Sequence, residues 1–191
     1  MTTAAVLRAR RRELSRQMRN AGGQEVIDAA LDLLGRGERF IAYELIQHHR
    51  QAPSLMTEKL LVTLAATLHS WDSVDMFAMY LSGPAWLNGR IGARTIEKWT
   101  RSKDRWWRRA ALASTILLSR AGRVDEVIPI CERLAGDRDD MVVKALSWAL
   151  REASKKAARA AKRFIDRHDV AARVRREVTS KLTTGLKNPR R

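Results

Sequence analysis

The chain has one cysteine, no long apolar run and few acidic residues, and each shortage excludes a class of protein. Cys131 alone can form neither an internal disulfide nor a cysteine metal cluster, so a reducing compartment is the simplest setting. The four histidines lie at no metal-ligand spacing with a carboxylate partner. No apolar run approaches the ~18 residues of a membrane span, and residues 1–20 lack the apolar segment of a signal peptide. We therefore expect a cytoplasmic protein that holds no metal and no other cofactor.

Acidic residues are outnumbered, and the excess of positive charge lies at the two ends. The chain holds 37 Lys and Arg against 21 Asp and Glu, a net charge of +16. Residues 1–20 contain six basic residues and one acidic residue, and residues 151–191 contain fourteen and four, so these ends carry 15 of the 16 net charges. A near-neutral body with basic flanks indicates a polyanionic partner, of which nucleic acid is the common case. An anionic membrane surface and tails that only aid solubility are the alternatives.

Apolar residues recur at helical spacing through most of the chain, and no stretch alternates between apolar and polar residues as a half-buried strand does. Glycines and prolines fall between the periodic segments. Pro53-Ser54 is expected to form a turn and helix N-cap, and Ser82-Gly83-Pro84 is expected to end a helix capped by Ser70 or Asp72. The pattern predicts an all-α protein with helices over 4–19, 24–34, 38–50, 55–68, 70–81, 86–99 (whole or broken), 106–120, 125–134, 141–156, 157–168 and 170–182.

Three tryptophan-containing helical stretches recur at a nearly constant step. From Trp71 to Arg109 is 38 positions, and from Arg109 to Trp148 is 39. Stacked helix pairs of the HEAT or armadillo kind repeat every 40 to 47 residues or so, and equivalent positions in such a stack lie on one surface. We expect an α-α superhelix with a basic concave face, made of a basic N-terminal helix and Gly-rich break (1–23), the superhelix (24–182) and a basic tail (183–191).

Each candidate site residue also has an ordinary structural interpretation. Trp71 and Asp75 are four apart, which places an indole and a carboxylate on one helix face, but a core tryptophan beside a solvated aspartate has the same spacing. Arg108 and Arg109 point about 100° apart around a helix, so one of them can grip phosphate while the other is a surface arginine. Trp148 lies among core-type residues. The shared period, rather than any single residue, favours a common site.

Three segments resemble, in order and separation, the signature stretches of the AlkD family of alkylpurine DNA glycosylases. They are Trp71-Asp72-Ser73-Val74-Asp75, Trp106-Trp107-Arg108-Arg109-Ala110-Ala111-Leu112 and Lys144-Ala145-Leu146-Ser147-Trp148-Ala149-Leu150-Arg151-Glu152. The resemblance covers residues 24–182 and implies a superhelix of HEAT-like repeats that binds duplex DNA. It also implies a monomeric, nucleoid-associated DNA repair enzyme that excises cationic alkylated purines such as N7-alkylguanine and N3-alkyladenine. Relatives usually begin with a longer helical region than the one that precedes Gly22-Gly23.

The resemblance also implies roles for individual residues. Trp71 and Trp148 match the aromatic walls of the lesion cleft, Asp75 matches the catalytic carboxylate, and Arg109 matches an arginine that contacts the DNA backbone. Residues 173–178 resemble the start of the family's C-terminal DNA-contacting helix. The DNA-binding residues expected on this basis are Arg108, Arg109, Lys144, Arg151, Arg173, Arg175 and Arg176.

The implied chemistry is that of a monofunctional glycosylase in base excision repair. A purine alkylated at N7 or N3 is cationic and leaves readily, so the task is to stabilise the oxocarbenium-like sugar, which an ionised carboxylate and electron-rich indole faces can do. No lysine nucleophile is required. Two other interpretations stay open: a non-catalytic HEAT-like protein that binds DNA or RNA through the same groove, and a protein-interaction scaffold.

Overall fold

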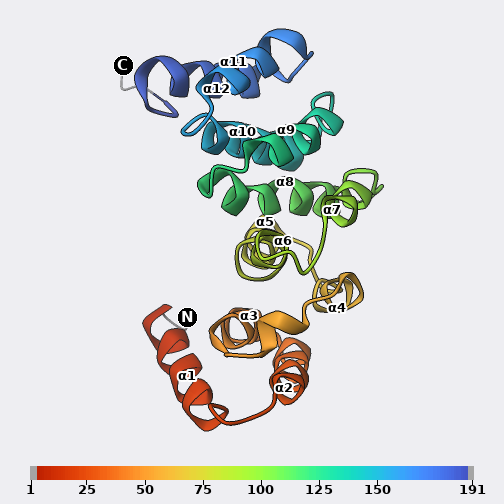
Figure 1. Ribbon diagram of the computed structural model, residues 1–191, viewed down its shortest axis with the longest axis vertical. Coiled ribbons are helices and arrows are strands. Elements are labelled where there is room, and N and C mark those ends of the chain that lie inside the picture. Colours follow the sequence, from red (N-terminus) through yellow and green to blue (C-terminus); the bar gives the residue numbers. More distant parts are fainter. Residues whose placement is uncertain (1–3, 189–191) are drawn as a thin grey trace.

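A computed structural model describes residues 4–188, and these residues form a stack of helices without a strand (Figure 1). The predicted all-α superhelix is confirmed. The elements are α1 (Ala4–Gln17), α2 (Gly23–Gly35), α3 (Arg39–His48), the 3-10 turn η1 (Ala52–Leu55), α4 (Glu58–Leu64), α5 (Trp71–Phe77), the π-turn η2 (Ala78–Ser82), α6 (Gly83–Leu87), α7 (Ala93–Thr100), α8 (Arg105–Arg120), α9 (Val124–Arg133), α10 (Asp140–Ala153), α11 (Ala158–Arg167) and α12 (Ala172–Thr184).

Side-chain caps determine where the central helices begin. The Asp104 carboxylate accepts the Trp106 N–H at 2.9 Å before α8, and Asp139 accepts the Met141 N–H at 2.9 Å before α10. Each carboxylate satisfies a backbone donor that has no partner within the helix and carries negative charge at the positive end of the helix dipole. The two caps therefore fix the first turns of α8 and α10.

The expected helix over 55–68 is wrong in its start and extent. The Ser54 hydroxyl does not cap it, because it donates to the Gln51 carbonyl within η1. Thr57 caps α4 instead, accepting from the Leu60 N–H at 3.2 Å, and the helix ends at Leu64.

Ser82-Gly83-Pro84 does not break a helix, contrary to expectation. The helical chain continues from α5 through η2 into α6, because Pro84 lies in the first turn of α6, where its missing N–H costs little, and the wider π-turn precedes it. Gly83 permits the close packing there: a Cβ at this position would lie 2.6 Å from the Ala78 carbonyl oxygen and 3.3 Å from that of Ser114 on α8. The chain breaks after Leu87 instead, with Gly89 at a φ of +70°, so the segment 86–99 is broken.

Helix α8 occupies the centre of the stack and packs against α5, α6, α7, α9 and α10. Its residues from Arg109 to Ile116 are all buried. Trp107 of α8 joins Phe77 of α5 and Trp99 of α7 in an aromatic cluster, with ring centroids 6.3 Å and 5.0 Å from the Trp107 ring. Helix α8, which carries Arg109, therefore packs against both α5, which carries Asp75, and α10, which carries Trp148.

Helix α1 packs against α3. Leu7, Leu14 and Met18 face the core, and Arg11 donates to the buried Glu44 carboxylate at 3.1 Å.

Helix α12 extends two residues past the expected boundary at 182, and residues 189–191 of the expected tail lie outside the described part. Within residues 4–188 no helix is long and apolar enough to span a membrane.

Candidate active site

Asp75 and Arg109 form a bidentate ion pair between α5 and α8. Arg109 Nε donates to Asp75 Oδ1 at 2.9 Å and Nη2 donates to Oδ2 at 2.6 Å. The remaining arm, Nη1, donates to the backbone carbonyl of Met141 at the start of α10, at 2.7 Å. The fork geometry of a guanidinium orients both carboxylate oxygens. Arg109 therefore connects three helices and holds the Asp75 carboxylate in one position.

Burial dominates the electrostatics of this pair. The Arg109 and Asp75 side chains are only 6% and 19% exposed. Burial raises the pKa of Asp75 above its ordinary value, and the Arg109 guanidinium opposes that rise through its hydrogen bonds and its charge. The nearby Asp72 adds a smaller upward contribution.

Asp72 differs from Asp75 in position and environment. It is exposed in the first turn of α5, and its pKa is lowered, chiefly by a hydrogen bond from the Ser70 hydroxyl. Ser70 is the N-cap residue of α5, with Ser73 bonding back to it. Of the two candidates for the cap, the structure therefore selects Ser70.

The two tryptophans of the expected cleft are not core residues. Trp71 is 57% exposed at the start of α5. Trp148 is partly buried and lies on a stripe of α10, together with Met141, Lys144 and Arg151, that is less buried than the rest of the helix. This spacing of three and four residues marks one helix face. Both indoles are thus on the surface of helices adjoining the Asp75–Arg109 pair.

The choice between Arg108 and Arg109 is decided by their partners. Arg108 points away from Asp75: its Nε donates to Asp137 at 2.7 Å and Nη1 donates to the carbonyls of Ser102 and Lys103, both at 3.0 Å. Arg108 thus joins the loops before α8 and α10. Arg109 faces the site, but three of its five N–H groups are used within the protein. Its expected contact with the DNA backbone stays a prediction.

The other expected DNA-binding residues fall into two groups. Lys144, Arg151 and Arg173 lie together around the carboxylates of Asp140 and Glu177. Arg175 instead donates to the backbone carbonyls of Ile165 and His168 at the end of α11. Arg176 is exposed on α12. Contact of these residues with DNA also stays a prediction.

Sequence reasoning missed the groups that hold this arrangement together. No feature of the sequence indicates that the Met141 carbonyl binds Arg109, because every residue has a backbone carbonyl. Glu177 had a weak one, because it is the single acid in the Arg-rich segment 173–178. Within residues 4–188 no three His, Cys, Asp or Glu side chains are grouped to hold a metal ion.

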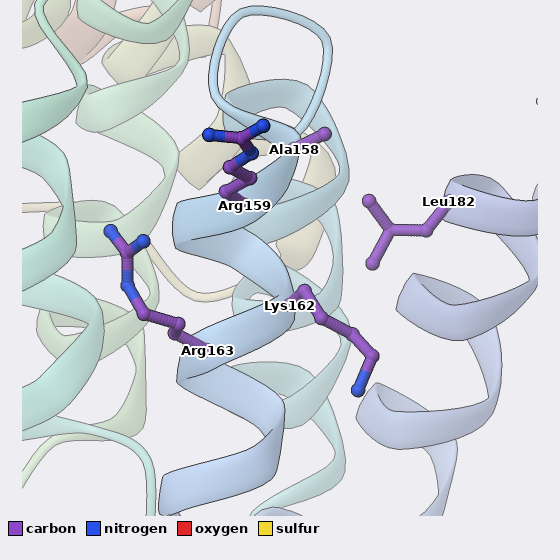
Figure 2. A pocket seen from close by; sticks show the side chains of 5 residues that line it. All are labelled: Ala158, Arg159, Lys162, Arg163 and Leu182. Atoms are coloured by element: carbon purple, nitrogen blue, oxygen red, sulfur yellow. The ribbon is translucent and has the colours of Figure 1, made fainter.

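A separate hollow of about 470 Å³ lies at the C-terminal end of the stack, away from Asp75. It is lined by Ala158, Arg159, Lys162 and Arg163 of α11 and by Leu182 of α12. Figure 2 shows Lys162 on the side of α11 that faces Leu182. The lining has aliphatic groups and cations but no carboxylate, hydroxyl or thiol, and Lys162 is paired with Asp166, so we assign it no chemistry.

Comparisons with known proteins bear on the family and the fold. Residues 2–182 match the model of the family described as DNA alkylation repair enzyme. A comparison with curated proteins finds no match. Among solved structures, a predicted DNA alkylation repair enzyme from Enterococcus faecalis is similar, with a TM-score of 0.78 and 16% identity over 95% of this chain and 86% of that chain. At this identity the likeness shows the fold alone. The family model spans nearly the whole chain, and the protein therefore belongs to the DNA alkylation repair enzyme family.

Proposed function

We propose that the protein is a monofunctional DNA glycosylase that hydrolyses the N-glycosidic bond of cationic alkylated purines in duplex DNA. The observation that carries the proposal is the Asp75–Arg109 pair, a carboxylate fixed by two hydrogen bonds on the same helix as the exposed indole of Trp71. Binding to phosphates alone does not call for a carboxylate held at such a position, whereas a reaction that develops positive charge on a sugar does.

In this proposal each residue has one task. Asp75 stabilises the oxocarbenium-like sugar as the bond to the base breaks, and its outer edge orients the attacking water. Trp71 and Trp148 present π-faces to the same positive charge, a contact that contributes about 0.5–2 kcal/mol each. Arg109 touches neither base nor sugar; it positions Asp75. The alkylated base leaves without a general acid because it is already cationic, and hydrolysis leaves an abasic site.

The test is release of free N7-methylguanine from methylated duplex DNA, with spontaneous depurination subtracted in a reaction without protein. We expect release in proportion to protein concentration, and strands that stay intact until alkali cleaves them at the abasic site. Strand cleavage without alkali would contradict a monofunctional mechanism. If no base is released while salt-sensitive duplex binding persists, the protein is a non-catalytic DNA binder.

The pH dependence of base release follows from the raised pKa of Asp75. The reaction needs the ionised carboxylate, so activity falls as the pH drops through the pKa of Asp75 in the folded protein. Because burial raises this pKa, the acid limb lies at higher pH than the titration of an exposed aspartate. The measurement is the rate of release against pH under saturating protein, corrected for acid depurination, with helicity followed by circular dichroism. A rate that stays constant down to the ordinary aspartate pKa would refute the assignment.

A further inference from the structure

Glu177 of α12 lies at the centre of a group of cations between α10 and α12. Its side chain is only 4% exposed. Oε2 accepts a hydrogen bond from the Ser147 hydroxyl at 2.6 Å and lies 3.7 Å from Arg151 Nε. Oε1 lies 3.3 Å from Arg173 Nε and 3.6 Å from Lys187 Nζ. One buried carboxylate thus contacts three cations from two helices and the segment after α12.

Asp140 extends this network toward the start of α10. Its Oδ1 accepts from Arg173 Nη1 at 2.9 Å, and its Oδ2 lies 2.5 Å from Lys144 Nζ. We call the four cations, Lys144, Arg151, Arg173 and Lys187, the α10–α12 strip. With the two carboxylates counted, the strip keeps a net charge of +2. More positive charge is gathered here than the internal partners neutralise.

The strip adjoins the proposed active site. Lys144 and Arg151 flank Trp148 on the less buried stripe of α10, and Met141 on the same stripe supplies the carbonyl that Arg109 binds. The two α10 cations of the strip therefore share a helix face with Trp148, and Arg109 contacts the backbone at the start of the same helix.

We propose that Glu177 is a positioning residue that holds the cations of the α10–α12 strip in place for the phosphates of the DNA strand; the choice of DNA as ligand rests on the proposed function. Glu177 and Asp140 engage Nε and Nη1 of Arg173, which leaves Nη2 for a phosphate oxygen. Arg151 Nε donates to the Ser147 hydroxyl at 3.3 Å and lies 3.7 Å from Glu177 Oε2. Long cationic side chains lose rotamer freedom when they bind, and side chains already held by a carboxylate lose less. Pre-organisation is thus the contribution of Glu177.

The proposal and simple electrostatics predict opposite signs for one substitution. Glu177→Gln removes a negative charge and raises the net charge of the strip from +2 to +3. Charge alone then predicts tighter DNA binding with a steeper dependence on salt. Loss of positioning predicts weaker binding, because the amide no longer holds Arg151, Arg173 and Lys187.

The experiment measures binding of an unmodified fluorescent duplex by anisotropy across a salt series, with the full chain. For Glu177→Gln we expect the Kd to rise about tenfold. The slope of log K against log salt should fall by about 1, the equivalent of one lost phosphate contact. Ser147→Ala leaves the charge unchanged and removes both the bond to Glu177 Oε2 and the bond that the hydroxyl accepts from Arg151 Nε; we expect its Kd to rise about threefold. If Glu177→Gln does not fold, Ser147→Ala alone tests the proposal.

The matched control is Asp169→Asn, which adds the same unit of charge outside the strip. The Asp169 side chain is 93% exposed and pairs with Arg138, so we expect its Kd to stay equal or fall slightly. Unchanged or tighter binding by Glu177→Gln or by Ser147→Ala overturns the proposal, as does absence of duplex binding by the unaltered chain. If the protein releases no base but these differences in DNA binding are observed, the proposed glycosylase activity is wrong and the proposed role of Glu177 is supported.

Discussion

Asp75→Asn is expected to lower the rate of N7-methylguanine release by about 10²–10³-fold, the range found when a preorganised electrostatic group is removed from an active site. The amide has the shape of the carboxylate but no charge to stabilise the sugar cation. It also presents an N–H₂ group to the Arg109 fork, where both Asp75 oxygens accept hydrogen bonds. The measurement is single-turnover release under saturating protein, so that weaker DNA binding does not enter the rate.

The matched control for this prediction is Asp72→Asn. Asp72 lies three residues before Asp75 on the same helix, carries the same charge and is exposed. Its contacts are with Ser70 at the cap rather than with Arg109, so we expect release to stay close to that of the unaltered chain. Equal losses in the two variants would show a general effect of charge on α5 and would refute the special role of Asp75.

Arg109→Met is expected to lower both stability and activity. The substitution keeps an apolar stem of similar length but leaves Asp75 without its partner, and removing one member of a buried pair costs about 3 kcal/mol in the free energy of unfolding. It also removes the group that opposes the rise in the pKa of Asp75. The acid limb of base release should therefore move to still higher pH. Urea unfolding and the pH–rate profile measure the two effects.

A comparison within α8 and a double variant make this prediction specific. Arg120 lies on the same helix and pairs with Glu152, but its side chain is half-exposed, so Arg120→Met should cost only about 0–1 kcal/mol. Adding Asp75→Asn to Arg109→Met removes the unpaired charge, and the double variant should be more stable than Arg109→Met alone. Additive losses in the double variant would contradict a coupled pair.

Local signals in the sequence predicted most of the helical architecture. The apolar periodicity depends on near neighbours, and the structure places helices over most of the predicted segments. The step of 38 and 39 residues between Trp71, Arg109 and Trp148 correctly indicated that these three residues lie on stacked helices. The predicted helix boundaries were wrong at two places, Pro53-Ser54 and Ser82-Gly83-Pro84. In the second case, packing of Gly83 against α8 overrode a turn signal.

The sequence by itself thus determined the all-α class, the spacing of Trp71, Arg109 and Trp148, and the basic ends, because these follow from residue type and order. Tertiary structure alone decided the partners. Arg108 and Arg109 are alike in sequence, and only the positions of α5 and α10 direct Arg109 to Asp75 and Met141 while Arg108 faces Asp137. Likewise, Arg173 and Arg175 are two residues apart, yet one binds Asp140 of α10 and the other the end of α11. The partner of a charged side chain depends on which groups the fold brings within a few ångströms of it and shields from water. For Arg109 and Arg173, residues more than thirty positions away supply such groups.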